Sequence, residues 1–268
     1  MKKVRWVVQN NLIAENDRNQ MKTACEELGV LYEGTHVVPF SYGLSKFTID
    51  EHINIYYGST TFIGNIMLTD LDKTGIFSDD ENFLMSNYLE KWGDHMLSSE
   101  ARVLPYGNFI TENHNVKDQF FVRPNGDSKL FDGEVMEFGD IKKGIPSMNQ
   151  LDKVSIDDDD LVLVGPAYNI RKEWRNYIVD GKVISSSRYR ENFRLSKSAI
   201  DIPESMIKFV EDRAKEYAPN DVFVMDIALC GGEDEYYIIE CGGMNSVGFY
   251  HADIKSIVSS VTEYILNK

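Results

Sequence analysis

The sequence predicts a mixed α+β protein, in which a small N-terminal α/β unit precedes a larger part built mainly from hairpins. Short apolar runs alternate with a helical segment over residues 5–57, as in a small sheet with a crossover helix. Farther along, an Asp-Gly pair joins two β-rich runs, and two long apolar runs near the C-terminus flank a Gly-Gly turn. These patterns together predict several sheets covered by a few helices.

The N-terminal unit is expected to have the order β-α-β-β. Strands are expected at residues 5–8, 37–40 and 53–57, with a helix at residues 21–28 before the second strand. Gly29 follows that helix, and a residue without a Cβ atom suits the left-handed conformation that ends many helices. The resulting sheet should be small and either parallel or mixed.

A helix with an apolar stripe is expected between residues 76 and 95. Ser78, Asp79 or Asp80 is available to cap its N-terminus. We expect the stripe to pack between two lobes, and we expect a boundary between two domains near Ser78. The residues at helical spacing are Phe83, Leu84, Asn87, Tyr88, Lys91 and Trp92.

The strongest local signal is Asp180-Gly181, which lies between two β-rich runs. A type I′ turn needs positive φ angles at both central residues, and Asp-Gly supplies them, so a hairpin is expected here. An amphipathic helix should follow, with Asp201 as its cap and Pro203 in its first turn. Pro219 is expected to mark the end of that helix.

Composition argues against several classes of function. The formal charge of -15 at pH 7 disfavours a protein that binds nucleic acid through a broad basic face, because that affinity comes from lysine and arginine. The three cysteines show no CxxC spacing, which is typical of a reducing cytoplasm and argues against a disulfide framework or a zinc site. No segment approaches the length of a membrane span. We therefore expect a cytoplasmic protein with no nucleic-acid or membrane partner.

Two carboxylates interrupt the apolar runs near the C-terminus. Asp226 lies within the first run, and Glu240 ends the second. If the turn between them has an odd length, pairing Gly231 with Glu235 places Asp226 opposite Glu240 on the same face of a hairpin. A slip of one residue would put the two carboxylates on opposite faces.

Two such carboxylates repel each other and lose hydration, so leaving them without a partner would be unfavourable. A divalent cation resolves the conflict. Mg²⁺ prefers oxygen ligands and usually keeps waters or substrate phosphates in its remaining positions. The hairpin alone leaves an alternative open, in which one acid lies at a strand end and pairs with an arginine.

Cations and an amide that could complete the site lie elsewhere in the sequence. Arg123 ends a strand-like run and Lys129 follows a Pro-Asn-Gly-Asp turn, two positions suited to the phosphates of a nucleotide. Taken singly, each is better explained as ordinary surface charge. After Glu240, a glycine-rich turn carries Asn245, whose amide could reach the same metal.

Several motifs follow one another in a fixed order. They are Phe121-Val122-Arg123-Pro124 with Asp127, Lys129, Phe131 and Gly133, then Glu173-Trp174-Arg175 before the Asp-Gly-Lys hairpin, then Asp226 and Glu240 with Asn245-Ser246-Val247-Gly248-Phe249-Tyr250. In this order they resemble the ATP-grasp superfamily. More narrowly, they resemble its R2K clade, which is often encoded by bacteriophages and in which an arginine replaces the first nucleotide-binding lysine.

The resemblance runs from about Lys117 to the C-terminus and implies an ATP-grasp fold, in which two α+β subdomains hold ATP and Mg²⁺ bridges its phosphates. The N-terminal stretch, residues 1–78, is similar to the small α/β domain that precedes ATP-grasp cores. The ATP-grasp domain would then take residues 79–268. Its nucleotide lobe would span about residues 117–165, and its metal-binding lobe about residues 166–268.

The resemblance also implies roles for four cations. Arg123 and Lys129 would hold phosphates of ATP, while Arg175 and Arg188 would meet the γ-phosphate or an acyl phosphate. The chemistry requires such cations, because a carboxylate that attacks a phosphoryl group brings one anion towards another.

For the rest of the nucleotide, the resemblance implies a hinge strand and a ribose contact. Val162, Leu163 and Val164 would pair with adenine through their backbone, and Glu173 would bind the ribose hydroxyls.

For the metal, the resemblance implies Asp226 and Glu240 as ligands of Mg²⁺. The chain departs from the common Glu-x-Asn pattern, because Gly242 occupies the asparagine position and cannot ligate through a side chain. Asn245 is therefore expected to take that role.

The implied activity is ATP-dependent ligation of a carboxylate to an amine through an acyl phosphate, with release of ADP and phosphate. The partners would be small molecules, amino acids, peptides or proteins that carry these two groups, while the oligomeric state leaves no signature. If a phage encodes the chain, the compartment is the host cytoplasm. Two alternatives stay open: a kinase on the same scaffold that phosphorylates a hydroxyl, and a nucleotide-binding module without turnover.

Overall fold

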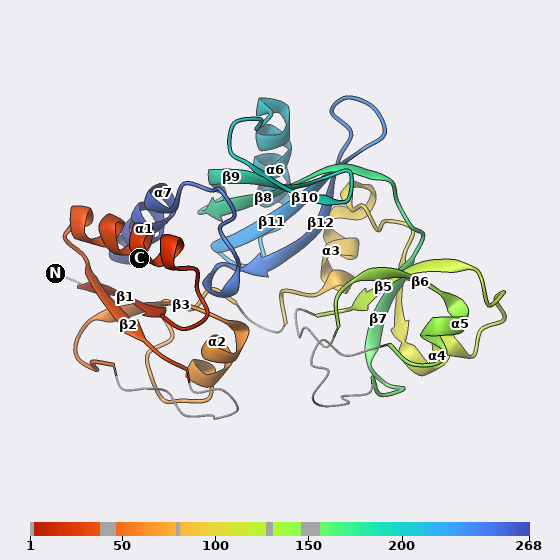
Figure 1. Cartoon of the computed structure of the whole chain (residues 1–268), viewed down its shortest axis with the longest axis horizontal. Helices are drawn as coiled ribbons and strands as arrows, with labels where there is room; N and C mark the ends of the chain where they lie inside the picture. The colour runs from red at the N-terminus through yellow and green to blue at the C-terminus, as the bar shows by residue number, and fades with distance from the viewer. Residues whose placement is uncertain (1–2, 38–46, 79–80, 127–130, 146–155) are drawn as a thin grey trace.

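The computed structural model of the chain describes residues 3–37, 47–78, 81–126, 131–145 and 156–268. These residues form three sheets that follow one another along the long axis of the molecule (Figure 1). A three-stranded sheet lies at the end that holds both termini, a five-stranded sheet lies in the middle, and a four-stranded sheet lies at the far end. The mixture of helices and strands confirms the predicted α+β class.

The N-terminal sheet is parallel, and its central strand is buried on both faces. Strand β1 (Val4–Gln9) lies between β2 (Leu31–Thr35) and β3 (Ile53–Tyr57), and all six residues of β1 are buried. The third strand agrees with the prediction. The second strand comes earlier in the chain than the expected residues 37–40, of which residues 38–40 lie outside the described residues.

Two helices belong to this N-terminal sheet. Helix α1 (Glu15–Leu28) ends at Gly29, which has a φ angle of 67° and confirms the predicted left-handed cap. Helix α2 (Thr60–Met67) follows β3, and the side chain of Ser59 accepts a hydrogen bond from the backbone N–H of Phe62 at its start.

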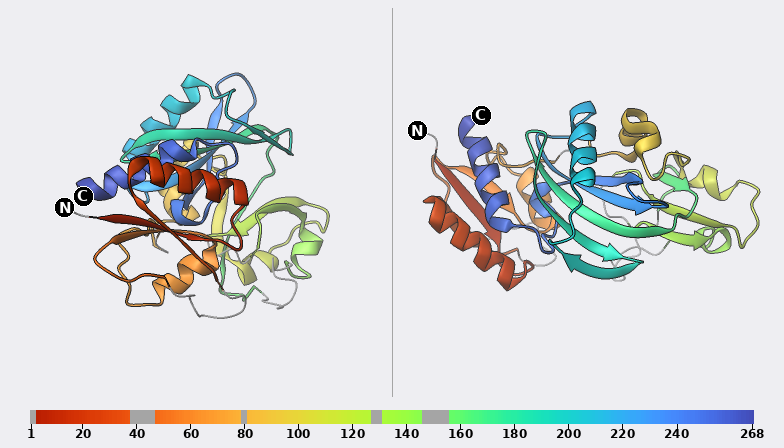
Figure 2. Two further views of the ribbon diagram at one scale, coloured as in Figure 1. Left: turned by 60° about the vertical axis from the view of Figure 1, so that its left-hand side comes forward. Right: turned by 90° about the horizontal axis from the view of Figure 1, so that it is seen from above.

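The last helix of the chain returns to this first sheet. Helix α7 (Ile254–Asn267) lies beside α1 (Figure 2), and its apolar face shares one core with β1. Within that core the indole N–H of Trp6 donates to the Thr262 hydroxyl at 3.0 Å. The division of the chain after residue 78 stays a prediction, and the structure adds that the two ends of the chain are packed together.

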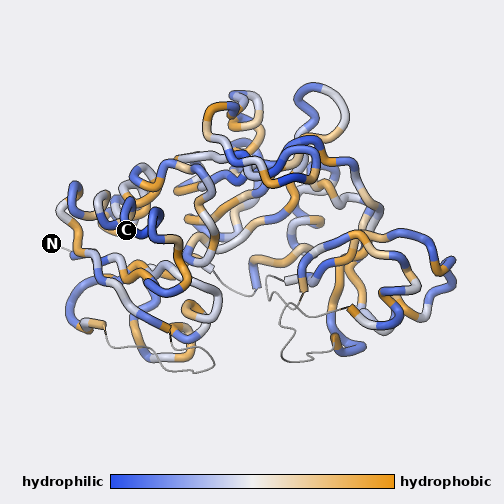
Figure 3. Tube along the Cα trace, in the orientation of Figure 1, coloured by the Kyte–Doolittle hydropathy of each residue, from blue (hydrophilic) through white to orange (hydrophobic). Residues whose placement is uncertain are grey.

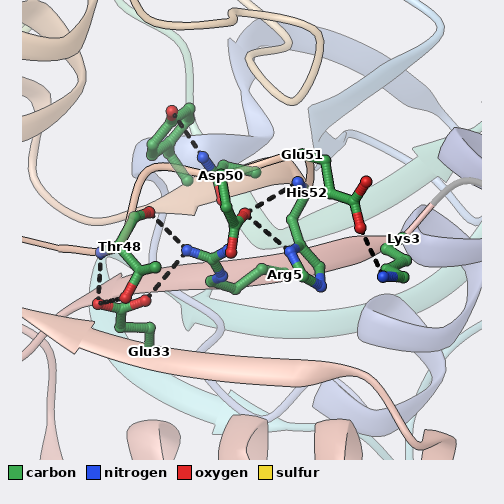
Figure 4. Close-up of polar contacts among 9 residues, drawn as sticks. Lys3, Arg5, Glu33, Thr48, Asp50, Glu51 and His52 are labelled. Atoms are coloured by element: carbon green, nitrogen blue, oxygen red, sulfur yellow. Dashed lines mark hydrogen bonds and ion pairs between the residues drawn. The ribbon is translucent and has the colours of Figure 1, made fainter.

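A buried arginine ties the segment before β3 to the N-terminal sheet (Figure 4). Arg5 of β1 is 2% exposed, and its guanidinium contacts Glu33 at 3.2 Å and also Asp50. Asp50 accepts from the backbone N–H of His52, and this bond, with the Arg5 contact, lowers the pKa of Asp50 to about 2 against a smaller effect of burial. These bonds anchor residues 48–52 beside β1.

The four-stranded sheet is antiparallel, and its order is β4-β7-β5-β6. Short helices α4 and α5 supply aromatic side chains to its core, among them Phe109 and Phe138. The bounds of its elements are β4 (Arg102–Pro105), α4 (Tyr106–Ile110), β5 (Gln119–Pro124), β6 (Glu134–Glu137), α5 (Phe138–Ile141) and β7 (Leu161–Gly165).

The five-stranded sheet is also antiparallel, with the order β10-β9-β8-β11-β12. The predicted Asp-Gly hairpin joins β8 to β9, because Asp180 and Gly181 have φ angles of 49° and 71° between paired strands. The hydropathy tube shows β11 and β12 as largely hydrophobic and the turn between them as largely hydrophilic (Figure 3). The strands are β8 (Ile170–Val179), β9 (Lys182–Glu191), β10 (Arg194–Ser198), β11 (Val222–Cys230) and β12 (Tyr236–Gly243).

Helices α3 (Met85–Trp92) and α6 (Glu204–Glu216) share a core with one face of the five-stranded sheet. Two short 3₁₀ helices, η1 (Gly93–His95) and η2 (Met244–Ser246), follow α3 and β12. In the described part of the chain, no helix is long and apolar enough to span a bilayer.

Both predicted helix caps need correction. Helix α3 begins only after Leu84, so Ser78 does not cap it, and Asp79 and Asp80 lie outside the described residues. Instead, the side-chain oxygen of Asn125 accepts from the backbone N–H of Ser86 at 2.9 Å. This cap comes from a distant part of the chain, which is why local sequence did not indicate it.

The Asp201 cap of helix α6 is also wrong. Pro203 holds the N-cap position, where no side chain caps the helix. The carboxylate of Asp201 instead binds Lys172 at 3.2 Å and Arg188 at 2.5 Å. Two cations on neighbouring strands compete more strongly for this carboxylate than backbone N–H groups do.

Candidate functional site

A cavity of about 670 Å³ lies between the four-stranded and the five-stranded sheets. The linker from β7 to β8 joins the two sheets along one side of the cavity. The wall on the four-stranded side includes Phe121, Arg123, Val135 and Gly165, the linker supplies Pro166 and Tyr168, and the five-stranded side supplies Glu173, Arg175, Asp226 and Glu240. The structure thus brings together five of the residues predicted for the site.

Asp226 and Glu240 face each other across β11 and β12, as predicted, but by a different route. Next to the turn, Leu229 pairs with Tyr236, which leaves an even number of residues between these two partners. A β-bulge between Asp226 and Ile227 then shifts the register by one residue, and the extra residue on β12 is Ile239. The bulge therefore brings the carboxylates to one face, whereas the expected odd-length turn does not occur.

Each of the two carboxylates pairs with an arginine. Arg175 of β8 binds Asp226 through two nitrogens, at 2.9 Å and 2.8 Å. Arg123 of β5 reaches across the cavity from the other sheet and contacts Glu240 at 2.6 Å. The acids thus meet arginines, which is the alternative that the hairpin pattern left open, extended from one acid to both.

The Arg175–Asp226 pair is deeply buried. Burial raises the pKa of Asp226 and the nearby charge of Glu240 adds to that effect, while the Arg175 guanidinium opposes it. For Arg175, burial alone would lower the pKa, but the Asp226 carboxylate outweighs burial and raises the pKa well above its usual range. Arg175 therefore keeps its charge, and each partner makes the buried charge of the other tolerable.

Glu173, predicted to bind ribose, lies in the wall of the cavity and has two partners. The Tyr189 hydroxyl donates to its carboxylate at 2.7 Å, and Arg190 contacts it at 3.3 Å. The Tyr189 ring is stacked on Tyr250 with centroids 4.9 Å apart, and the Arg175 guanidinium lies 5.2 Å from the Tyr250 ring centroid. Acid, cations and stacked rings thus form one continuous wall.

Sequence reasoning missed Tyr189 and Arg190 and chose Arg188 in their place. A second bulge explains the error: Trp174 pairs with Arg188 and Glu173 pairs with Arg190, which leaves Tyr189 as the extra residue. Regular alternation would have placed Arg188 and Arg190 on the same face. The bulge turns both Tyr189 and Arg190 towards the cavity.

The structure does not bring Arg188, which was predicted to be catalytic, into the cavity. Its guanidinium binds Asp201 at 2.5 Å and Glu191 at 3.0 Å, and the residue does not line the cavity. Its cross-strand neighbour Trp174 packs in the core beside α6, on the opposite face of the sheet.

Asn245 is not positioned as a metal ligand, which corrects that prediction. Its side chain is fully buried, and its amide oxygen accepts from the backbone N–H of Phe77 at 2.7 Å. Its amide nitrogen donates to the carbonyls of Tyr56 and Gly75 at 2.6 Å and 2.8 Å. These bonds attach the end of β12 to the N-terminal sheet and use the whole amide.

The structure does not bring the three predicted hinge residues to the cavity either. Val162, Leu163 and Val164 are buried in β7, which is paired with β4 on one side and with β5 on the other. Their backbone groups therefore belong to the sheet and are not available to a base. The cavity is lined instead by the residues that follow β7. Lys129, predicted to hold phosphates, lies outside the described residues.

The acids fit a magnesium ion by their chemistry, because two facing carboxylates at the wall of a cavity offer the hard oxygen ligands that Mg²⁺ prefers. Among the described residues, no group of three or more His, Cys, Asp or Glu side chains could enclose a metal. Waters or phosphate oxygens would have to complete the coordination.

A cavity between two antiparallel sheets, with acids and arginines paired in its wall, agrees with the ATP-grasp fold expected from the sequence. Residues 102–259 match the ATP-grasp domain of the R2K clade, family 2. The match covers more than half of the 268 residues, so the chain belongs to this family. Among curated proteins, none matches the chain.

Solved structures agree with this fold. The ATP-grasp ligase PsnB complexed with a minimal precursor is 11% identical, with a TM-score of 0.56 over 98% of this chain and 100% of that chain. A RimK domain protein from Sphaerobacter thermophilus is 11% identical, with a TM-score of 0.56 over 97% of this chain and 100% of that chain. D-alanine–D-alanine ligase from Bacillus anthracis is 12% identical, with a TM-score of 0.52 over 100% and 98%. At these identities the likeness shows a shared fold.

Proposed function

We propose that the protein is an ATP-dependent carboxylate–amine ligase that forms an amide through an acyl phosphate. The observation that carries this proposal is the gathering of Arg123, Arg175, Asp226 and Glu240 in one cavity between two sheets. Family membership supports ATP as the nucleotide. The ligase activity is further supported by the ligases among the structures that share the fold.

In this proposal the two arginines change partners when the nucleotide binds. Arg123 and Arg175 are now paired with Glu240 and Asp226, and both guanidiniums border the cavity. Phosphate oxygens are strong acceptors for guanidinium, so ATP would draw the arginines from the acids. The freed carboxylates would hold Mg²⁺, which when bound screens the phosphate charges and stabilises the transferring phosphoryl group.

The base and ribose would lie at the other end of the cavity. Adenine would sit beside Gly165, the last residue of β7, and the linker residues Pro166 and Tyr168, all of which line the cavity. Glu173 is four per cent exposed and borders the same space, so its carboxylate is suited to accept from the ribose hydroxyls. Tyr189 and Arg190 would hold that carboxylate in place.

The reaction would proceed in two steps. A substrate carboxylate attacks the γ-phosphorus, the bond between that phosphorus and its bridging oxygen breaks, and ADP leaves. An amine then attacks the acyl carbon, the acyl–oxygen bond breaks, phosphate leaves, and the nitrogen loses a proton to give the amide. Arg123 and Arg175 would lower the barrier of the first step by stabilising charge on the transferring oxygens.

Peptides are one candidate class of substrate. PsnB was solved with a precursor peptide and AMPPNP, and it resembles this chain over 99% of both chains, with a TM-score of 0.56 and 12% identity. The D-alanine–D-alanine ligase has a smaller substrate by its name, so amino acids remain a second class.

The proposal is tested by incubating the full chain with Mg-ATP and panels of amino acids and peptides. We expect ADP to form together with a product whose mass corresponds to loss of water between the two substrates. Glu240→Gln should abolish the reaction, while Glu137→Gln, on the exposed edge strand β6, should leave it unchanged. A phosphate ester in place of an amide would instead identify a kinase.

A nucleotide-binding module without turnover is the second candidate. The observation that favours it is Asn245, whose amide is fully engaged and leaves two carboxylates as metal ligands. This candidate predicts that Mg-ATP raises the melting temperature. It also predicts that no ADP forms with any substrate pair.

A further inference from the structure

The turn between β9 and β10 contains a residue that the backbone does not favour. Glu191 pairs with Arg194, so the turn has two central residues, Asn192 and Phe193, with φ angles of 47° and 62°. Such turns favour Asn followed by Gly. Asn192 suits its position, but a side chain at the second position is strained, because its Cβ crowds the following carbonyl oxygen.

The preceding hairpin of the same sheet has the favoured residue at this position. Val179 pairs with Lys182, and the central residues Asp180 and Gly181 have φ angles of 49° and 71°. Phe193 therefore stands where the neighbouring turn has glycine. The turn itself does not favour a phenylalanine at this position, so we looked for a contact of its side chain that does.

Burial in the folded protein does not supply such a contact. Phe193 is 62% exposed, and it belongs to none of the hydrophobic core clusters that the described residues form. It does line the cavity between the two sheets. Val135 of β6 lines the same cavity from the other sheet and is 47% exposed. Two apolar side chains, one from each sheet, thus stand exposed at its rim.

The position of the turn indicates which part of a ligand it would meet. The backbone N–H of Asn192 donates to the carbonyl of Arg171 at 2.8 Å, so the turn lies beside the start of β8. Tyr168, near the end of the linker, and Ile170, the first residue of β8, border the cavity. This is the end at which adenine is placed in the proposed function.

We propose that Phe193 packs its ring against the adenine of the bound nucleotide and covers the open side of the base. The inference rests on the proposed nucleotide site. An aromatic ring suits a purine, because both have flat apolar faces that stack. Backbone strain of this kind persists where a ligand contact requires it.

The test measures ATP and ADP affinity of the full chain by titration calorimetry, with Phe193→Gly beside the unchanged protein. We expect the dissociation constants of both nucleotides to rise at least about fivefold, the lower end of what base stacking contributes. The rise should be the same for both, because the contact is with the base. Without nucleotide, the variant should melt about 2–4 °C higher, because glycine relieves the strain.

Two variants serve as controls. Asp180→Gly places a glycine at the first position of the neighbouring turn, outside the cavity, where aspartate already suits the positive φ angle, and should leave both affinity and melting temperature little changed. Phe193→Tyr keeps the ring and should bind nucleotide as the unchanged protein does. Unchanged ATP affinity in Phe193→Gly would overturn the proposed contact between Phe193 and adenine. Failure of the unchanged protein to bind ATP would instead overturn the proposed function.

Discussion

The two ends of one face of the five-stranded sheet differ completely in character. At one end Tyr177, Val179 and Val224 are buried in the core that the sheet shares with β1 and α7. At the other end, on the same strands β8 and β11, Arg175 and Asp226 border the cavity. β-bulges occur at both ends: one lies at Asp226–Ile227 and one at Glu173–Trp174 beside the cavity, and a third lies at Tyr177–Ile178 in the packed end. The difference teaches that one face of a sheet serves as core where β1 and α7 pack on it and as a site where it borders the cavity.

The largest effect is expected at the charged end, from Arg175→Met. The variant leaves Asp226, which is 2% exposed, without its guanidinium, and breaking a buried pair in this way costs about 3–5 kcal/mol of stability. Urea unfolding measures the loss. The double variant Arg175→Met with Asp226→Asn should recover much of that stability while staying inactive. If the single variant is as stable as the unchanged protein, the pair is not the buried contact described above.

The next largest effect is expected from Asn245→Ala, where η2 contacts the N-terminal sheet. It leaves an N–H and two carbonyls unpaired in a buried place, so we expect a loss of roughly 3 kcal/mol or more in urea unfolding. In the protein that remains folded, the Mg²⁺ dependence of ATP turnover should stay unchanged. A shifted Mg²⁺ requirement would show that Asn245 acts at the metal after all.

The packed end is tested by Val224→Ala. The side chain is 2% exposed, and removing two methyl groups there should lower stability by about 2 kcal/mol. Nucleotide affinity should not change, because Val224 faces the core rather than the cavity. A weaker affinity for ATP, measured by calorimetry below the melting temperature, would mean that the two ends are coupled.

The smallest effect is expected far from this face, from Asp50→Asn beside β1. The pKa of Asp50 lies at about 2 in the folded chain, below its value in the unfolded chain, so its charge stabilises the fold above about pH 4. The variant should therefore be slightly less stable at neutral pH, and the difference should shrink as the pH falls from about 4 towards 2. Urea titrations at several pH values measure it, and a gap that widens in acid would refute the assignment.

Local signals predicted much of the fold. Gly29 ended its helix, Asp180-Gly181 formed its hairpin, and residues 53–57 formed β3 as expected. These features depend on residues that are close in sequence. The caps of α3 and α6 were missed because Asn125 and the partners of Asp201 come from distant strands.

The candidate site was predicted only in part, for a related reason. Asp226 and Glu240 share a face as expected, but the bulge that aligns them has no local signature. Another bulge places Arg188 and Arg190 on opposite faces of the sheet, whereas regular alternation would place them on the same face. Asn245 looked like a ligand because its amide is suited to metals, whereas the fold uses that amide to join β12 to the first sheet. Bulges and long-range bonds follow from packing, which a single sequence does not display.

In the proposed function the cavity arginines, and not Arg188, bind the phosphates of ATP. Calorimetric titration with Mg-ATP of the unchanged protein, Arg123→Met and Arg188→Met tests this claim directly. We expect Arg188→Met to bind as the unchanged protein does and Arg123→Met to bind at least about tenfold more weakly, a loss of ~1.4 kcal/mol. Equal affinity in Arg123→Met, or a loss confined to Arg188→Met, would contradict it.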